Sequence, residues 1–186
     1  MEYPNWFDGQ KHNFEAQLKH LMWKPDLRFL QIGAFTGDAS VWLCETVLND
    51  PTCMLIDVDT WTGSNEDEHK NINWSRLYPH YKYRVGIYEK VIALKMTSDE
   101  YFAGNNETMF DFIYIDGDHT TAQVERDANG AWKLLKPNGI LAFDDYLWRG
   151  GEDCPKPAID KFLAEHEGQY KMLVDSYQIW IQKNDN

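Results

Sequence analysis

Three aspartates follow two short apolar runs and offer the clearest chemistry in the sequence. Asp116 follows residues 112–115, and Asp144 and Asp145 follow residues 140–143. The segment between the runs has the length and periodicity of one helix, so the stretch predicts a strand–helix–strand unit. Because parallel strands joined by right-handed crossovers end at one edge of a sheet, the three carboxylates should converge there. A cation would relieve their mutual repulsion, and we expect a hard divalent metal ion such as Mg²⁺.

An alternative interpretation assigns these acids to local structure. One acid would cap the following helix, and the others would face water. We favour that interpretation for Asp118 alone, and the metal site for Asp116 and Asp145 together.

A turn with two glycines lies between a strand-like run and a helix-like run. Residues 28–32 predict the strand, Gly33 and Gly37 lie in the turn, and Asp38 is the expected cap of the next helix. Such a turn leaves backbone N–H groups free and lets a ligand approach the main chain closely. The spacing differs from the three-glycine fingerprint of dinucleotide enzymes, and tight turns also use glycine without binding anything. The turn therefore favours a nucleotide-type ligand only in combination with an acid after the next strand.

Two further aspartates lie at the end of the next predicted strand, residues 53–58. They come about 20 residues after the glycine turn, where nucleotide-binding α/β folds keep an acid for the ribose hydroxyls. One carboxylate can accept hydrogen bonds from two vicinal hydroxyls. We assign that role to Asp59, which begins a turn. Asp57 lies inside the apolar run and is equally well explained as a strand residue paired with a neighbouring donor.

The remaining apolar runs complete an alternating α/β pattern. We expect further strands over residues 91–96, 170–175 and 178–182, and helices over residues 14–23, 97–100, 121–135 and 156–166. Because only a short turn separates the last two strands, they should form an antiparallel hairpin on an otherwise parallel sheet. The sequence thus predicts a single α/β domain over residues 1–186 with a Rossmann-like, mostly parallel seven-stranded sheet. Helices should cover both faces, and residues 1–27 should form an N-terminal helical segment.

Residues 64–83 interrupt this pattern with a polar and aromatic stretch. The segment is short of aliphatic residues and lacks the apolar stripe of a packed helix. We expect a mobile cover over the carboxyl edge of the sheet that binds an acceptor. A solvated helical insertion would have the same composition, and the sequence does not separate the two.

The composition is that of a globular chain that would repel polyanions. Its 186 residues suit one domain, the net charge of −12 disfavours nucleic acid, and no apolar run is long enough to span a membrane. Three cysteines without a Cys-x-x-Cys pair, and an amino end unlike a signal peptide, predict a cytoplasmic location. Eight tryptophans predict an aromatic pocket for a small-molecule acceptor. An exposed Trp6, Phe7 or Trp148 could form a homodimer contact.

Four segments occur in an order that resembles the class I S-adenosylmethionine-dependent methyltransferases. They read Phe-Leu-Gln-Ile-Gly-Ala-Phe-Thr-Gly at 29–37, Ile-Asp-Val-Asp-Thr-Trp-Thr-Gly at 56–63, Asp-Phe-Ile-Tyr-Ile-Asp-Gly-Asp-His at 111–119 and Leu-Lys-Pro-Asn-Gly-Ile-Leu-Ala-Phe-Asp-Asp-Tyr at 135–146. The likeness is greatest to the small branch of metal-dependent O-methyltransferases that act on catechols and antibiotic sugars. It covers about residues 28–146, and the terminal hairpin fits the same fold. Each segment alone is weakly specific, whereas the four in this order are strongly so.

The resemblance implies a donor site, a metal site and a base. The donor S-adenosylmethionine would contact Gly33, Ala34, Phe35, Thr36, Gly37, Asp57, Asp59, Thr60, Trp61, Ser98, Asp99, Asp116 and Gly117. Asp59 would hold its ribose, and residues 97–99 would lie beside its adenine. Magnesium would be held by Asp116, Asp144 and Asp145. His119 falls where catechol-type members carry a basic residue, three places after the first metal ligand.

One position departs from the family's pattern. The family usually has Glu or Asp where this chain has Gln31, two residues before the glycine turn. An amide can still accept a hydrogen bond from the donor's amino group, but it offers no charge. We therefore expect reduced donor affinity or a different cofactor.

Methyl transfer to oxygen requires a well-placed acceptor whose oxygen has become more anionic. A magnesium ion would lower the pKa of the acceptor hydroxyl, and either His119 or Asp116 would accept its proton. A hydrogen bond to the loop backbone explains His119 at least as well. Two other functions stay open: an NAD(P)-dependent Rossmann oxidoreductase, which would need a third glycine and a parallel sixth strand, and a non-catalytic protein that keeps the donor pocket as a scaffold.

Overall fold

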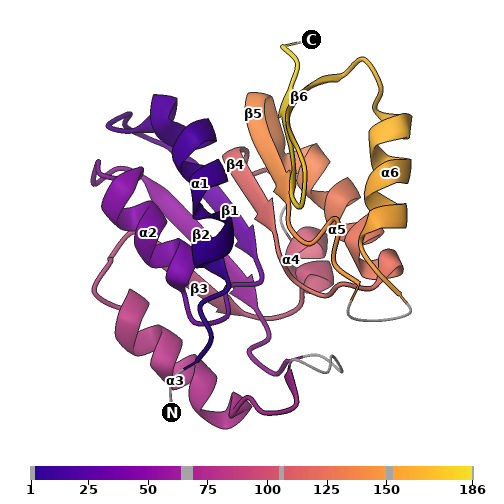
Figure 1. Cartoon of the computed structure of the whole chain (residues 1–186). Coiled ribbons are helices and arrows are strands. Elements are labelled where there is room, and N and C mark those ends of the chain that lie inside the picture. The colour runs from indigo at the N-terminus through magenta and orange to yellow at the C-terminus, as the bar shows by residue number, and fades with distance from the viewer. Residues whose placement is uncertain (1–2, 64–68, 105–106, 150–152, 186) are drawn as a thin grey trace.

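A seven-stranded sheet forms the centre of the computed structural model, which describes residues 3–63, 69–104, 107–149 and 153–185. The strand order is β3-β2-β1-β4-β5-β7-β6 (Figure 1). The strands are β1 (Arg28–Ile32), β2 (Met54–Asp59), β3 (Val91–Lys95), β4 (Phe110–Ile115), β5 (Leu135–Phe143), β6 (Tyr170–Asp175) and β7 (Ile179–Lys183). The first five run parallel, and β7 pairs antiparallel with both β5 and β6. The predicted mostly parallel sheet with a closing hairpin is confirmed.

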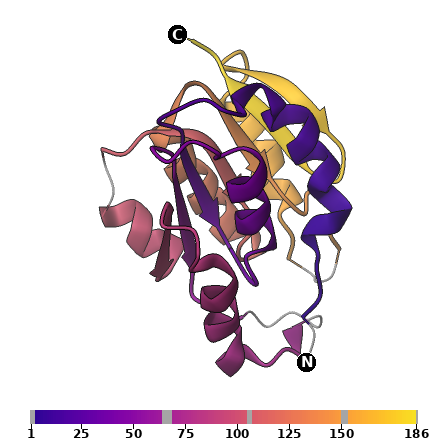
Figure 2. The ribbon, with the colours of Figure 1, turned by 90° about the vertical axis from the view of Figure 1, so that its left-hand side faces the viewer.

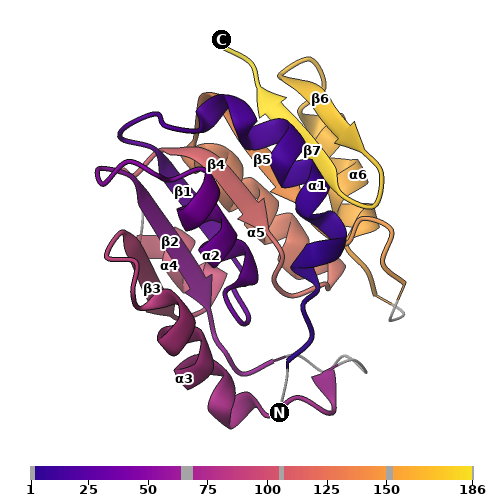
Figure 3. The same cartoon turned by 60° about the vertical axis from the view of Figure 1, so that its left-hand side comes forward.

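Helices cover both faces of this sheet, so the domain has three layers. They are α1 (Phe7–Leu18), the short 3-10 helix η1 (Lys19–Leu21), α2 (Asp38–Thr46), α3 (Trp74–Val85), α4 (Ser98–Gly104), α5 (Thr121–Leu134) and α6 (Lys156–Glu165). Figure 3 shows α1 and α2 in front of the sheet, with α5 behind it. In the described parts of the chain, no helix combines the length and the apolar composition needed to cross a bilayer.

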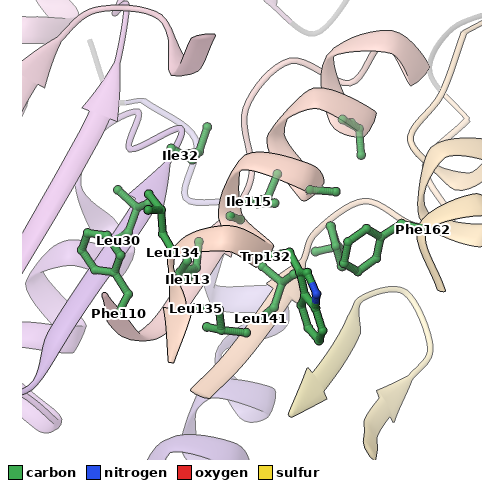
Figure 4. Packing of buried hydrophobic residues seen from close by; sticks show 14 of the residues in the cluster. Leu30, Ile32, Phe110, Ile113, Ile115, Trp132, Leu134, Leu135, Leu141 and Phe162 are labelled. Atoms are coloured by element: carbon green, nitrogen blue, oxygen red, sulfur yellow. The ribbon is translucent and has the colours of Figure 1, made fainter. Parts of the chain in front are cut away.

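Alternate side chains along each central strand pack into one of two cores. One core joins the strands to α4, α5 and α6, and Figure 4 shows Ile113 and Leu141 facing Trp132 of α5 and Phe162 of α6. The other core joins the opposite face to α1 and α2 through residues such as Phe14. Because both faces are covered, these strands are apolar almost throughout, as the sequence suggested.

The sheet reverses its winding direction between β1 and β4. From β1 the chain moves outward through β2 to β3, and it then returns to the centre at β4 and continues to β5 on the other side. In open α/β sheets, ligands bind beyond the carboxyl ends of the strands at such a switch point. The end of β1 is Ile32, which precedes the glycine turn, and the end of β4 is Ile115, which precedes Asp116.

Two helix starts differ from prediction. The first helix begins at Phe7 and not at residue 14. The N-cap of α2 is Gly37, whose backbone is left-handed at φ 80°, so Asp38 lies inside the first helical turn and does not cap it. The Asp38 carboxylate instead accepts a hydrogen bond from the hydroxyl of Thr36 and pairs with Arg84 of α3 at 2.7 Å.

Residues 74–83 of the segment predicted as a mobile cover belong to a packed helix. Residues 64–68 lie outside the described part of the chain, and from Trp74 onward the helix α3 buries Leu77, Tyr81 and Val85. These three residues recur every four positions and pack against Ala34 and Trp61. The prediction that this stretch lacks an apolar stripe is therefore wrong, because a tyrosine supplies one member of the stripe. The start of the described chain lies beside this helix (Figure 2), where the Tyr3 hydroxyl donates to the carbonyl of Asn73.

Replacing Gly33 with alanine should strongly destabilise the protein. Gly33 has φ 84°, and an added Cβ would lie 1.8 Å from the carbonyl oxygen of Asp116, a backbone atom that cannot move aside alone. We expect the free energy of unfolding, measured by urea denaturation, to fall by about 3 kcal/mol or more. Gly9→Ala is the matched control, because Gly9 lies in α1 with no atom within 4 Å of the added Cβ. It should stabilise the protein by roughly 0.5–1 kcal/mol. Equal stabilities of the two variants would contradict the close approach of the strand ends.

Candidate functional site

A cavity of about 520 Å³ opens at the carboxyl edge of the sheet. Residues that follow β1, β2, β3, β4 and β5 line it, together with side chains from α1, α5 and the β6–β7 turn. Its size lies in the range of small-molecule sites. The predicted residues on its wall are Gly33, Phe35, Asp59, Thr60, Ser98, Asp99, Asp116, Gly117, His119, Asp144 and Asp145.

Two carboxylates and an imidazole meet on this wall. Ligand-capable atoms of Asp116, His119 and Asp145 all lie within 4.8 Å of one another. The His119 Nε2 atom is 3.0 Å from Oδ2 of Asp145, and the hydroxyl of Tyr177 donates to the other oxygen of Asp145 at 2.7 Å. The predicted convergence of Asp116 and Asp145 at the sheet edge is confirmed.

Asp144 lies on the same cavity wall, and both oxygens of its carboxylate accept hydrogen bonds from other groups. Its Oδ2 accepts a hydrogen bond from the hydroxyl of Tyr114, and its Oδ1 accepts one from the backbone N–H of Asp145 at 2.8 Å. The three residues whose possible ligand atoms lie close together are therefore Asp116, His119 and Asp145. The sequence had predicted Asp144 as the third member, and not His119. Adjacent residues at a strand end point in different directions, and Asp145 is further turned by its left-handed backbone at φ 56°.

Burial and the charges of neighbouring carboxylates raise the pKa values of Asp116 and Asp144. Burial raises the pKa of Asp116 well above its usual value, and the charges of Asp144 and Asp145 raise it further. Burial likewise raises the pKa of Asp144 to about 6, with a smaller contribution from Asp145. Adjacent buried carboxylates that resist ionisation are the environment in which a bound cation is most favourable. Carboxylate oxygens, which Asp116 and Asp145 supply, suit a hard divalent ion. The donor set thus fits a divalent cation.

Asp59 organises the glycine turn through three backbone contacts. Its Oδ2 accepts hydrogen bonds from the N–H groups of Ala34 and Phe35, both at 2.8 Å, and its Oδ1 accepts one from Trp61 N–H at 2.6 Å. The indole of Trp61 donates to the Phe35 carbonyl at 2.9 Å, which ties the two turns together. Asp59 also lines the cavity, and its predicted contact with ribose hydroxyls stays a prediction.

Five residues predicted to touch the donor are not on the cavity wall. They are Ala34, Thr36, Gly37, Asp57 and Trp61, which lie behind the wall. Asp57 is fully buried and accepts hydrogen bonds at 2.6 Å from the hydroxyls of Ser40 and Tyr81, and burial raises its pKa to about 6. The interpretation of Asp57 as a strand residue paired with neighbouring donors is confirmed.

Gln31 also points away from the cavity. The side chain is buried, and its Nε2 donates to the carbonyl of Gly33 at 2.8 Å. The expectation that its amide meets the donor's amino group is therefore wrong, because the amide holds the glycine turn from beneath. Any effect of the uncharged Gln31 on donor affinity would therefore act through the conformation of the glycine turn.

The helix after β4 is capped by a residue other than the predicted one. The side chain of Thr120 accepts a hydrogen bond from the N–H of Gln123 and so caps α5. Asp118 accepts from the N–H of Thr120 at 2.8 Å, which shapes the turn before the helix. Asp118 lines the cavity as well.

Several wall residues were not identified as site residues from the sequence. Trp6 of the N-terminal segment stacks on Phe35 with ring centres 4.6 Å apart, and Trp148 lies 4.9 Å from the His119 ring. The sequence suggested both tryptophans as dimer contacts, and both line the cavity of their own chain. Tyr177 comes from the hairpin turn. No local pattern marks these positions, and only the high aromatic content pointed to such a wall.

Asp127 of α5 is a buried carboxylate on the cavity wall. It is 1% exposed, and its Oδ1 accepts a hydrogen bond from Gln123 Nε2 at 2.9 Å. Its Oδ2 has no hydrogen-bond partner among the residues that the structure describes. Burial raises the pKa of this carboxyl to about 6.

Comparison with known proteins identifies the fold and a family. A family described as "Methyltransferase domain" matches residues 30–146. The chain is 24% identical to "Probable caffeoyl-CoA O-methyltransferase 3" of Dictyostelium discoideum, over 96% of this chain and 67% of that protein. It is 21% identical to a caffeoyl-CoA O-methyltransferase of Stellaria longipes, over 74% and 53% of the two chains. An uncharacterized protein of Acanthamoeba polyphaga mimivirus is 27% identical over 79% and 64%. The chain thus spans between about half and two thirds of these relatives.

Solved structures share the fold at lower sequence identity. The O-methyltransferase from Bacillus cereus in complex with SAH superimposes with a TM-score of 0.67 at 15% identity, over 98% of this chain and 83% of that one. The O-methyltransferase TomG from Streptomyces achromogenes, in complex with SAM, gives a TM-score of 0.64 at 14% identity, over 98% and 82%. The predicted Rossmann-like fold is confirmed.

Replacing Asp127 with asparagine should stabilise the protein in a pH-dependent way. The pKa of Asp127 is about 6 in the folded protein and near 4 in an unfolded chain, so the wild type loses stability as pH rises from about 4 to 6. Asparagine carries no charge to bury and can still accept from Gln123. We expect the variant to gain on the order of 2 kcal/mol at pH 7.5 and almost nothing at pH 4, measured by urea denaturation. A gain of the same size at both pH values would contradict this account.

Proposed function

This chain belongs to the methyltransferase domain family, and from that premise we propose that it transfers a methyl group from S-adenosylmethionine to a hydroxyl oxygen of a small acceptor. The observation that carries the proposal is that one cavity contains both the glycine turn and the Asp116, His119 and Asp145 set. The caffeoyl-CoA O-methyltransferases among the relatives support transfer to oxygen.

The donor half of the cavity suits a ligand without phosphates. When bound, S-adenosylmethionine supplies a methyl group activated by a sulfonium. The N–H groups of Ala34 and Phe35, which a pyrophosphate would need, already donate to the Asp59 carboxylate. The Asp59 carboxylate at the turn would repel the phosphates of a dinucleotide. It would attract the positive charge of a sulfonium compound. The antiparallel β7 also departs from the parallel sixth strand that an NAD(P)-dependent oxidoreductase would have.

The acceptor half of the cavity combines carboxylates, an imidazole and a phenol. Asp116 and Asp145 would hold a divalent cation, whose chemistry there is to lower the pKa of an acceptor hydroxyl. His119 accepts the proton from that hydroxyl, because Asp145 fixes one edge of its ring and the side chain borders the cavity. Tyr177 holds Asp145 in place through its hydroxyl. Trp148 lies beside the His119 ring, with ring centres 4.9 Å apart.

The first prediction concerns the choice of donor. Calorimetric titration should give saturable binding of S-adenosylmethionine and S-adenosylhomocysteine, and no heat of binding with NADH or NADPH. The physical reason is the occupied N–H groups of the glycine turn. Binding of a nicotinamide dinucleotide in place of the sulfonium compound would overturn the proposal in favour of an oxidoreductase. Binding of S-adenosylmethionine without its consumption in the presence of Mg²⁺ and a panel of phenols and sugars would favour a non-catalytic scaffold.

The second prediction concerns Asp145. Asp145→Asn keeps a residue type that tolerates the left-handed backbone at φ 56°, but it removes the charge that would hold the cation. We expect at least a hundredfold loss of turnover, roughly the cost of losing one electrostatic group in a site, with donor affinity changed by only a few fold. Asp145→Ala should abolish turnover in the same way.

Asp26→Asn is the matched control for the Asp145 variant. Asp26 has a similar backbone at φ 58° and lies before β1, at the opposite end of the strands from the cavity. Its variant should turn over like the wild type. Unchanged activity in Asp145→Asn, or full activity of the wild type in excess chelator, would contradict the metal role.

A further inference from the structure

We infer that the acceptor of this enzyme carries a positive charge beside its reacting hydroxyl and that anionic acceptors, coenzyme A thioesters among them, are rejected. The inference rests on the proposed function and concerns the substrate class of the same cavity. It is carried by the charges and rings on the cavity wall, by the saturation of the glycine turn, and by the scarcity of cations on the described wall.

The charged side chains of the described cavity wall are mostly aspartates. Seven aspartates line it, and among the described residues no lysine or arginine does so. The segments outside the described part of the chain contain no lysine or arginine in their sequence, so they cannot supply one. Within the described chain, Asp99 alone of these aspartates is paired with an arginine, Arg126 at 3.0 Å. The donor's sulfonium and a divalent cation together would bring three positive charges against the remaining six carboxyl groups.

Lysine and arginine, two common anion-binding residues, are absent from the described part of this wall, and two N–H groups of the glycine turn are already used. Phosphates and carboxylates are bound by arginine, by lysine or by free backbone N–H groups at a turn. In the glycine turn, the N–H groups of Ala34 and Phe35 donate to Asp59. An acceptor with the phosphates of coenzyme A would therefore meet no lysine or arginine among the described wall residues. Three of the relatives carry caffeoyl-CoA O-methyltransferase names, and this chain is only 21–24% identical to them.

The uncharged part of the wall also favours a cation. Trp6, Phe35, His69 and Trp74 form a continuous group of rings, with centres 4.6 Å apart for Trp6 and Phe35 and 4.9 Å apart for His69 and Trp74. All four line the cavity, and Trp148 adds another ring beside His119. The face of an aromatic ring attracts an ammonium group, most strongly for tryptophan. The aromatic rings and the carboxylates of the wall thus both favour an acceptor with a positive charge.

The test uses three catechols that share the reacting ring and differ in side-chain charge. They are 4-(2-aminoethyl)catechol, 4-ethylcatechol and 3,4-dihydroxyphenylacetate, which are cationic, neutral and anionic at neutral pH. We expect kcat/KM to decrease in that order, with at least about tenfold between the cation and the anion. The difference should shrink in high salt, because exposed charges are screened. Caffeoyl-CoA should not be methylated. An equal or higher kcat/KM for the anionic catechol, or efficient methylation of caffeoyl-CoA, would overturn the inference.

A pair of variants tests the cause of the preference. Gln10 of α1 lines the cavity outside the residues that carry the chemistry. Gln10→Lys should lower the ratio of kcat/KM for the cationic catechol to kcat/KM for the anionic catechol by about threefold. Gln10→Glu should raise the same ratio. Identical ratios in both variants would show that wall charge does not set the preference.

Binding measurements separate this inference from the proposed function. Calorimetric affinities of the three catechols in the presence of S-adenosylhomocysteine should follow the same order even where turnover is slow. If the protein neither binds nor consumes S-adenosylmethionine but the catechol affinities still decrease from cation to anion, the proposed function alone is contradicted. If the catechols are methylated but their affinities do not decrease from cation to anion, the inference alone is contradicted.

Discussion

The contact between the end of β1 and the end of β4 is the constraint on which the site depends. Gly33 approaches the carbonyl of Asp116 so closely that a Cβ has no room, while Asp116 N–H donates to Ile32 at 2.8 Å and Gly33 N–H donates to Val58 at 2.9 Å. Three strand ends are thus joined by backbone contacts. Because of this junction, the turn that borders the donor side and the first acid of the acceptor side begin at the same point.

Buried polar side chains support the turn from beneath. The Gln31 amide donates a hydrogen bond to the carbonyl of Gly33. The Asp57 carboxylate accepts hydrogen bonds from the hydroxyls of Ser40 in α2 and Tyr81 in α3. Burying a carboxylate is unfavourable, as the raised pKa of Asp57 indicates, and two hydroxyl donors offset part of that cost. The helix α3 is therefore a structural support of the glycine turn. It packs closely against Gly37, where an added Cβ would lie 2.5 Å from Val85.

The sequence predicted the topology well because topology depends on patterns that are local. Apolar runs of the right length, two glycines after a strand and acids at strand ends are enough to place Asp116 and Asp145 together. Side-chain direction was less predictable. Asp144 and Asp145 are neighbours, and the choice between them depends on a left-handed backbone and on the Tyr114 hydroxyl. Contacts made by Trp6 and Tyr177 come from opposite ends of the chain, and no spacing in the sequence encodes them.

One electrostatic principle connects the two halves of the cavity. A glycine turn at a strand end is a general anion site, and this chain fills it with its own Asp59. The turn then presents a carboxylate where related α/β folds present free N–H groups, so the donor side accepts a ligand without phosphates. On the acceptor side, Asp116 and Asp145 again present carboxylates with no lysine or arginine beside them among the described wall residues. A cavity with carboxylates at both ends would favour the sulfonium of the proposed donor, the proposed metal cation and an acceptor compatible with the same field.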